Sequence, residues 1–339
     1  MRRPVTDEVR AVLVSRLRLM LFVLIAGIAA VPASAQKPRA DLPAKPWFVD
    51  DTKLFDEFME KLIELAKGGK CLAHEKLTAK MKSGTKAKVA LTKASDKALS
   101  PEDIYKTVLP SVFIVGSVYK DNDGEWNDGL YATAWVAAAD GVLVTNWHVF
   151  EELEPEEVFG AVDHKGNVYP MIDFLGGDKT ADVAVFRIAA KGLTPLPVSE
   201  DFAPVGSWVS VLSHPGDNFF VFTTGNVTRY SSNKSEDGKR ERWMGLTAEY
   251  AGGSSGSPVL NKYGSVVGMA ALTLTIEDGA GTPKPIEGRR LRREKPNLAP
   301  PPREKPEAKV EAKPAPAMTV QMVLKMAVPG PTILKSFEK

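Results

Sequence analysis

The chain has 339 residues and a formal net charge of +2; 44% of its residues are hydrophobic and 25% are charged. This length suffices for one or two domains, and the composition is that of a soluble globular protein. The near-neutral charge gives no reason to expect nucleic acid as a partner. The single cysteine, Cys71, excludes an intrachain disulfide, and Cys71 with His74 is too small a set for a zinc site, so we expect no metal and no cofactor.

Residues 1–35 have the pattern of a cleavable export signal. Arg10, Arg16 and Arg18 precede an apolar run over 19–31, which is shorter than the roughly 20 residues that span a bilayer. The sequence Ala-Ser-Ala that follows is a small-residue cleavage site. We therefore expect a periplasmic or extracellular protein without stable membrane insertion after cleavage. The alternative is an uncleaved membrane anchor.

Residues 36–100 are expected to form an N-terminal extension that is partly helical. Apolar residues between 51 and 67 recur at helical spacing, which predicts an amphipathic helix. Ser100 is a favourable N-cap, and Pro101 suits the first helical position. A second, short helix should therefore run to about Val108.

Beyond these helices the sequence changes to short β-rich runs bounded by turn residues. Many short strands with regular turns indicate an all-β sandwich or barrel. The predicted strands cover 112–118, 130–138, 142–146, 182–188, 208–213, 220–224 and 265–275.

A Gly- and Ser-rich loop at 252–258 offers two candidate nucleophiles. Gly-x-Ser-x-Gly around Ser254 fits the nucleophile elbow of α/β-hydrolases, whose triad follows the chain order Ser, acid, His. No histidine follows residue 214, which excludes that arrangement. The order His, Asp, Ser belongs to the chymotrypsin type, where the motif Gly-x-Ser-Gly makes Ser255 the candidate nucleophile.

His148 and Asp182 are the candidate base and orienting acid. His148 follows the predicted strand 142–146, a rigid mount for a base that must stay within reach of a hydroxyl. The alternative is a structural histidine packed beside Trp147. Asp182 is a lone carboxylate at the head of an apolar strand, where burial without a partner is costly. The alternative there is a turn residue that starts the strand.

In this order the motifs resemble those of the trypsin-like serine peptidases, in particular the bacterial Deg-type periplasmic proteases. Thr-Asn-Trp-His-Val at 145–149 is similar to the histidine motif of that family, and Asp-Val-Ala-Val at 182–185 is similar to its acid motif. Gly-Gly-Ser-Ser-Gly-Ser-Pro-Val at 252–259 is closer to the bacterial glutamyl endopeptidases. The resemblance covers roughly 101–276 and, we infer, 318–339.

The resemblance implies a fold of two six-stranded antiparallel β-barrels with the active site between them. His148 and Asp182 would come from the first barrel and Ser255 from the second. The backbone N–H groups of Gly253 and Ser255 would form the oxyanion hole. The resemblance also implies a set of substrate-binding residues: Glu249, Tyr250, Ala251, Ala270, Ala271, Leu272 and Thr273.

Two of these residues bear on specificity. Thr273 stands where the family often has glycine, so we expect a shallow site that favours small or medium aliphatic side chains. Glu249 is the main challenge to this expectation, because its carboxylate at the floor of the site would favour basic side chains instead.

Residues 277–317 are rich in Pro, Lys, Glu and Arg and are predicted to be a disordered insertion. The second barrel still needs a strand, because an open edge leaves backbone groups unpaired. The run 320–328 is the only later one with strand-like alternation. We therefore expect 318–339 to supply the closing strand and C-terminal helix of the peptidase domain over 101–276. The alternative is a secreted tail.

Together these residues predict an exported serine endopeptidase that acts on protein or peptide substrates. Two other functions are compatible with the same fold. One is a non-catalytic module that binds proteins, and the other is a chaperone in which proteolysis is secondary. The sequence does not indicate an oligomeric state.

Overall fold

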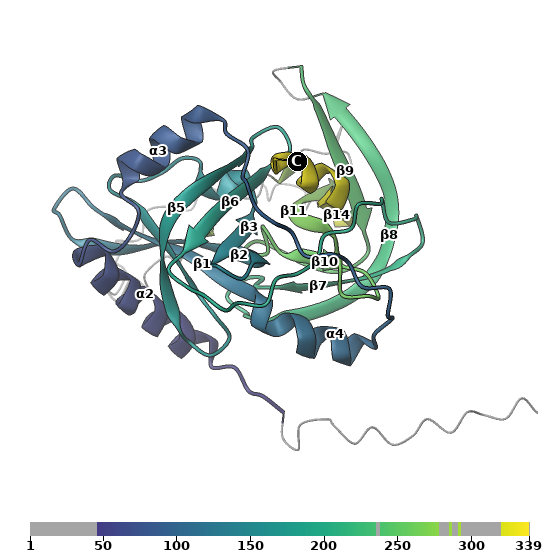
Figure 1. Cartoon of the computed structure of the whole chain (residues 1–339), viewed down its shortest axis with the longest axis horizontal. Helices are drawn as coiled ribbons and strands as arrows, with labels where there is room; N and C mark the ends of the chain where they lie inside the picture. Colours follow the sequence, from purple (N-terminus) through teal and green to yellow (C-terminus); the bar gives the residue numbers. More distant parts are fainter. Residues whose placement is uncertain (1–45, 235–237, 278–284, 287–290, 293–319, 339) are drawn as a thin grey trace, which may run out of the picture. The chain divides into compact units, whose positions relative to one another are not determined.

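The structure is a computed structural model that describes residues 46–234, 238–277, 285–286, 291–292 and 320–338. The chain divides into two units, 1–48 and 49–339. In the first unit only residues 46–48 are described, and they have no regular secondary structure. The predicted export signal therefore lies outside the described residues. All elements named below belong to the second unit (Figure 1).

The first barrel is a closed sheet of antiparallel strands in the order β1-β4-β5-β6-β3-β2, in which β1 also pairs with β2. Val115, Leu143 and Phe186, from three of these strands, are fully buried in one apolar cluster. The strands are β1 (Val112–Lys120), β2 (Trp126–Ala138), β3 (Val142–Thr145), β4 (Val158–Val162), β5 (Val168–Asp178) and β6 (Val183–Ile188).

The second barrel is built in the same way, with the order β10-β7-β8-β9-β14-β11 and a further pairing of β10 with β11. Tyr131 of the first barrel and Phe219 before β8 share a core cluster, with their rings 5.9 Å apart, so the two barrels pack together. The predicted fold of two six-stranded barrels is confirmed. The strands are β7 (Trp208–Ser213), β8 (Val221–Lys234), β9 (Arg240–Leu246), β10 (Pro258–Leu260), β11 (Val266–Glu277) and β14 (Val320–Pro329).

Strand β14 occupies the closing position, because Met326 pairs with Leu272 of β11 on one side and with Gly245 of β9 on the other. Helix α5 (Gly330–Ile333) and the 3₁₀ turn η3 (Leu334–Ser336) follow it.

Two short strands precede β14 in the chain. Strand β12 (Pro285–Ile286) pairs with β11, and β13 (Leu291–Arg292) pairs with β2. The sequence did not predict these pairings. Apart from them and Glu277 at the end of β11, the predicted insertion over 277–317 lies outside the described residues.

Helix α2 (Asp51–Lys67) packs on the first barrel where two strands carry glycine. A Cβ on Gly116 of β1 would lie 2.6 Å from the ring of Phe58, and a Cβ on Gly160 of β4 would lie 2.6 Å from a methyl of Leu62. The absence of a side chain at both positions lets the helix approach closely and bury its apolar face. The helix predicted for this range is confirmed.

Two shorter helices complete the N-terminal part of this unit. Helix α3 (His74–Ser83) contacts β5 and buries Leu77. Helix α4 (Pro101–Val108) begins as predicted, because the Ser100 hydroxyl accepts a hydrogen bond from the backbone N–H of Asp103 at 3.2 Å.

Strands β4, β5, β9 and β10 were not predicted, and β8 is much longer than expected. Strand β5 contains Pro170 and the pair Gly176–Gly177, which weaken the local preference for a strand. Strand β9 begins with the charged residues 240–242. These strands are specified by pairing with neighbours on both sides, which local composition does not reveal.

Candidate active site

His148 lies on a short 3₁₀ turn, η2 (Trp147–Phe150), directly after β3. The sequence pattern predicted a strand end at this point. Trp147, Val149 and Phe150 are buried, and the Trp147 ring meets that of Phe174 edge to face at 5.7 Å. The turn is therefore anchored on the first barrel by apolar packing, while the partly buried imidazole faces the second barrel.

Asp182 holds the imidazole through two contacts with His148. Its carboxylate accepts the backbone N–H of His148 at 3.0 Å and lies 2.9 Å from the ring Nδ1. Asp182 precedes β6 rather than lying in it, and its φ of +54° is uncommon for a residue with a side chain. The side chain of Asn146 stabilises this turn by donating to the Asp182 carbonyl at 3.0 Å.

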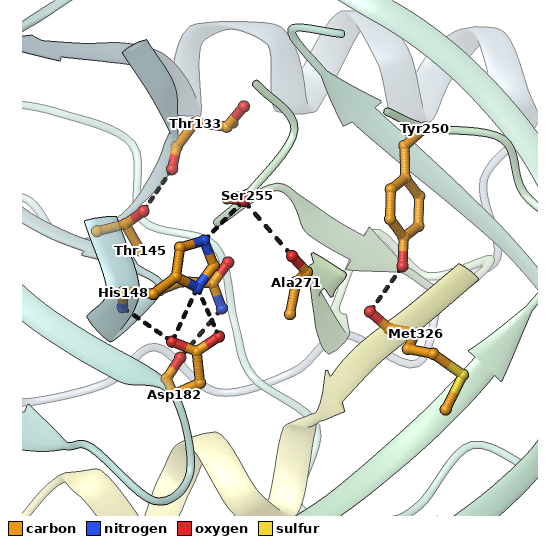
Figure 2. Close-up of polar contacts among 9 residues, drawn as sticks. Thr133, Thr145, His148, Asp182, Tyr250, Ser255, Ala271 and Met326 are labelled. Carbon is orange, nitrogen blue, oxygen red and sulfur yellow. Dashed lines mark hydrogen bonds and ion pairs between the residues drawn. The ribbon is translucent and has the colours of Figure 1, made fainter. Parts of the chain in front are cut away.

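The hydroxyl of Ser255 lies 2.9 Å from Nε2 of His148, so the imidazole bridges the carboxylate and the hydroxyl (Figure 2). With Nδ1–H donating to Asp182, Nε2 carries the lone pair and can accept the hydroxyl proton. Ser254, the other candidate nucleophile, is fully buried, and its hydroxyl has no hydrogen-bond partner in the described part of the chain.

The loop that carries Ser255 is bound to the first barrel through Thr133 of β2. The Thr133 N–H donates to the carbonyl of Ser255 at 2.8 Å, and its hydroxyl donates to the carbonyl of Gly253 at 3.0 Å. The Thr145 hydroxyl in turn donates to the Thr133 carbonyl at 2.7 Å (Figure 2). A Cβ on Gly256, whose φ is +89°, would collide with these same groups. These contacts hold the hydroxyl and the imidazole at a fixed separation.

The backbone N–H groups of this loop fall into two kinds. The N–H groups of Ser254 and Gly256 are engaged, because they donate to the carbonyls of Ala251 and Ala270. The N–H groups of Gly253 and Ser255 donate to no acceptor within the described ranges. Gly253 has a φ of +88°, a conformation that glycine adopts without strain. The resemblance assigned the oxyanion hole to these two groups.

His214 lies behind Gly253, since a Cβ on that glycine would collide with the His214 carbonyl. The imidazole is fully buried, and its Nδ1 accepts the backbone N–H of Phe220 at 3.0 Å. Burial lowers the pKa of His214 to about 3, and the nearby Phe113 carbonyl opposes this only in part. Nε2 has no hydrogen bond of ordinary geometry to any described residue, so burial dominates and the ring is neutral.

The residues implied as substrate-binding lie on the loop before Ser255 and on β11. The Ala271 carbonyl is 3.5 Å from the Ser255 hydroxyl, a marginal hydrogen bond. The hydroxyl of Tyr250, a buried residue, donates to the Met326 carbonyl at 2.7 Å (Figure 2). Ala270 is buried in β11, and its carbonyl accepts the N–H of Gly256. The carbonyl of Ala251 accepts the N–H of Ser254.

Sequence reasoning missed one charged residue in this area, Lys325 of β14. Its ammonium forms an ion pair at 3.0 Å with Glu249, and Lys325 lies opposite Thr273 of β11. A single charged residue within a mostly apolar strand was the signal that could have indicated it. Thr145 and Asn146 belong to the histidine motif, but the sequence pattern did not predict their hydrogen bonds to Thr133 and Asp182.

The described residues contain no group of three or more His, Cys, Asp or Glu side chains arranged to hold a metal ion. None of the described helices is long and apolar enough to cross a membrane.

Comparison with known proteins gives a family for the region that carries this site. Residues 132–269, which include His148, Asp182 and Ser255, match the family model described as the trypsin-like peptidase domain. This part of the chain is similar to a trypsin-like peptidase domain. The resemblance found in the sequence is therefore confirmed for this region.

The trypsin-like peptidase domain has relatives of the Deg type. The chain is 29% identical over 155 residues to a periplasmic serine endoprotease DegP-like of Chlamydia pneumoniae, covering 45% of this chain and 30% of that protein. It is 28% identical over 162 residues to the serine protease HhoB of Synechocystis sp., covering 46% and 37%. It is 30% identical over 149 residues to the serine protease HTRA1 of Xenopus tropicalis, covering 42% and 31%. The chain thus spans about a third of the length of these relatives.

Proposed function

We propose that this chain is an exported serine endopeptidase that hydrolyses peptide bonds through an acyl-enzyme. The observation that carries the proposal is the position of His148, whose two ring nitrogens lie 2.9 Å from the Asp182 carboxylate and 2.9 Å from the Ser255 hydroxyl. A hydroxyl is a weak nucleophile at neutral pH, and an adjacent oriented base is the usual means of activating it.

In the acylation step the Ser255 Oγ attacks the substrate carbonyl carbon while Nε2 of His148 takes the hydroxyl proton. The carbonyl π electrons move to oxygen and give a tetrahedral oxyanion. When this intermediate collapses, the C–N bond breaks and His148 returns the proton to the leaving amine. Asp182 stays ionised, holds the imidazole in its Nδ1–H form and stabilises the imidazolium.

In the deacylation step water takes the place of the leaving amine. His148 removes a proton from the water as it attacks the ester carbonyl, and the second oxyanion collapses with release of the carboxylic acid product. The proton then returns to the Ser255 oxygen. The cycle needs no group beyond this chain and water.

The free N–H groups of Gly253 and Ser255 are proposed to stabilise both oxyanions. Such preorganised donors typically contribute about 2.7–4 kcal/mol each to lowering the barrier. Their orientation depends on the hydrogen bonds from Thr133 to the carbonyls of Gly253 and Ser255.

Protein or peptide substrates and a periplasmic or extracellular location are part of the proposal. They are supported by the relatives whose names include serine protease and, for the Chlamydia pneumoniae protein, periplasmic. The apolar run and the Ala-Ser-Ala site within residues 1–35 agree with export. Sequencing the N-terminus of the protein recovered after expression in a bacterium tests this. Recovery of the protein with residues 1–35 intact would contradict cleavage.

A paired-serine experiment tests the catalytic proposal. Wild type, Ser255→Ala and Ser254→Ala are treated with a fluorophosphonate probe and assayed on a peptide library. We expect labelling and cleavage in wild type and Ser254→Ala, and neither in Ser255→Ala, with all three equally stable to heat. A folded wild type that neither labels nor cleaves would favour a protein-binding or chaperone-like role instead.

A further inference from the structure

Lys325 is a buried cation in the strand that closes the second barrel. Its side chain is only 8% exposed, and its Nζ donates to the Tyr250 carbonyl at 2.6 Å and pairs with a Glu249 carboxylate oxygen at 3.0 Å. It also lies 5.6 Å from the centre of the Tyr250 ring. Burying an ammonium is costly unless it is compensated, so these contacts call for an explanation.

This cluster of Lys325, Glu249 and Tyr250 lies beside the proposed nucleophile. Glu249 and Tyr250 belong to the loop that leads to Ser255. Lys325 is the register partner of Thr273, two residues along β11 from Ala271, whose carbonyl approaches Ser255. Two residues of a strand span roughly 6.6 Å. A distance of this order separates Ala271 from Thr273 along β11, and an acidic side chain of the substrate has to bridge it to meet Lys325.

The two charges of the cluster are held very differently. Glu249 has a side chain that is 74% exposed, whereas Lys325 is enclosed and fixed by the Tyr250 carbonyl. An exposed carboxylate is free to swing into water, and ion pairs of that kind contribute little. An ammonium carries three donors, and the described residues supply acceptors for two of them. A carboxylate arriving from a substrate can therefore use the third donor or replace Glu249.

The side chains beside Lys325 disfavour substrates with a large apolar or a basic side chain at this position. The Tyr250 ring is buried and fixed by its bond to Met326, so it fills space that a large apolar side chain would need. A basic side chain that approached Glu249 would also approach the Lys325 ammonium. Among the ordinary protein side chains that are charged at neutral pH, only the carboxylates of Asp and Glu are attracted by the Lys325 ammonium.

We propose that Lys325 is a specificity-determining residue that binds an aspartate or glutamate side chain on the residue whose carbonyl Ser255 attacks. This inference rests on the proposed function and names its substrate class. It replaces the expectation of small or medium aliphatic side chains that was based on Thr273 alone. Glu249 then acts as an internal competitor that occupies Lys325 when no substrate is bound.

The test compares matched peptides that differ only at the residue before the cleaved bond, which is Glu, Gln, Leu or Lys. We expect wild type to cleave the Glu peptide with a kcat/KM about 10- to 100-fold above that of the Gln peptide, the effect of one charge-assisted hydrogen bond. Lys325→Gln should bring the two peptides to parity. Glu249→Gln should widen the difference, because it removes the competitor, and Lys325→Arg should keep it.

Hydrolysis of the Leu peptide and the thermal midpoint show whether each variant is folded and competent. A preference for Lys that disappears in Glu249→Gln would overturn the inference, as would a Glu to Gln ratio that Lys325→Gln leaves unchanged. In both of these cases the enzyme still cleaves peptides, so the proposed peptidase function would stand while the inferred role of Lys325 would not. A wild type that cleaves no peptide and does not react with the fluorophosphonate probe contradicts the proposed function itself.

Discussion

The hydroxyl of Thr133 donates a hydrogen bond to the carbonyl of Gly253 at 3.0 Å, and this bond joins the two barrels at the site. Thr133 belongs to β2 of the first barrel, and Gly253 lies in the loop between β9 and β10 of the second. The peptide unit between Gly253 and Ser254 is therefore oriented by a side chain from the opposite barrel. This unit lies between the two peptide units whose N–H groups, those of Gly253 and Ser255, are the oxyanion donors in the proposed mechanism.

Thr133→Val should lower kcat about 10- to 100-fold, with a smaller change in KM. The substitution keeps the shape of the side chain but leaves the Gly253 carbonyl without its donor. The peptide unit between the two oxyanion donors is then no longer held in place, so their orientation is less well defined. Steady-state kinetics on one good peptide substrate measure this effect. Thr133→Ser is the control, because it keeps the hydroxyl and should retain most of the activity. Equal kcat in the valine variant and wild type would show that the bond has no role in orientation.

The rate should fall on the acid side of neutrality. His148 must be neutral to accept the Ser255 proton, so protonation of its imidazole in acid removes the base. As the protonated fraction rises, kcat/KM should drop toward about tenfold per pH unit, and the rate of fluorophosphonate labelling should follow the same curve. Both are measured on the same preparation after brief incubation at each pH. A labelling rate that stays constant well into the acid range is incompatible with a histidine base.

Stability should also depend on pH, through a different histidine. Burial lowers the pKa of His214 from 6.5 to about 3, so the unfolded chain binds a proton between these values that the folded protein excludes. Stability from this source is complete above about pH 6.5 and is lost progressively as the pH falls toward 3, with a total of a few kcal/mol. His214→Gln should therefore show a flatter pH dependence of the urea midpoint than wild type.

The matched control for this experiment is His164→Gln. His164 is only partly buried, and burial lowers its pKa without enclosing the ring as it does at His214. We expect the control to follow wild type closely. If both variants show the pH dependence of wild type, the acid sensitivity comes from other groups.

The residues that carry the proposed chemistry could be predicted from the sequence because each has a local signature. His148 follows an apolar strand, Asp182 precedes one, and Ser255 lies in a glycine-rich loop, while the chain order of the three excludes other folds. The helix over 51–67 could be predicted for the same reason, since its apolar spacing is local.

The residues that orient this site could not be predicted, because their partners are distant in the sequence. The Thr133 hydroxyl bonds a residue 120 positions away, and Lys325 bonds Tyr250 across 75 positions. Strand β5 was missed because Pro170 and two glycines weaken its local preference for a strand. It forms because it pairs with β4 on one side and β6 on the other. The proposed role of Lys325 in specificity rests on the pairing of β14 with β9 and β11, which no local pattern reveals.

The closing strand gives a prediction for the C-terminal part of the chain. Ending the chain at Gly281 removes β14, which leaves the facing edges of β9 and β11 unpaired and removes the buried residues Ala327 and Val328. Open edges and a lost core layer are both strongly destabilising, so the truncated protein should not fold. Circular dichroism and fluorophosphonate labelling of Ser255 measure the outcome.

Deletion of residues 284–314 should have the opposite result. Strand β12 pairs with β11, and β13 pairs with β2. Neither is one of the six strands that close a barrel, so neither barrel needs them for closure. Glu277 of β11 is the register partner of Val320 of β14, so a short turn is enough to join the two strands. The deletion variant should fold, label with the probe and cleave peptides at a rate within a few-fold of wild type, because loop length affects stability only weakly. A folded, active truncation at Gly281 together with an inactive deletion variant would mean that β14 does not close the barrel and that the deleted segment contributes to the site.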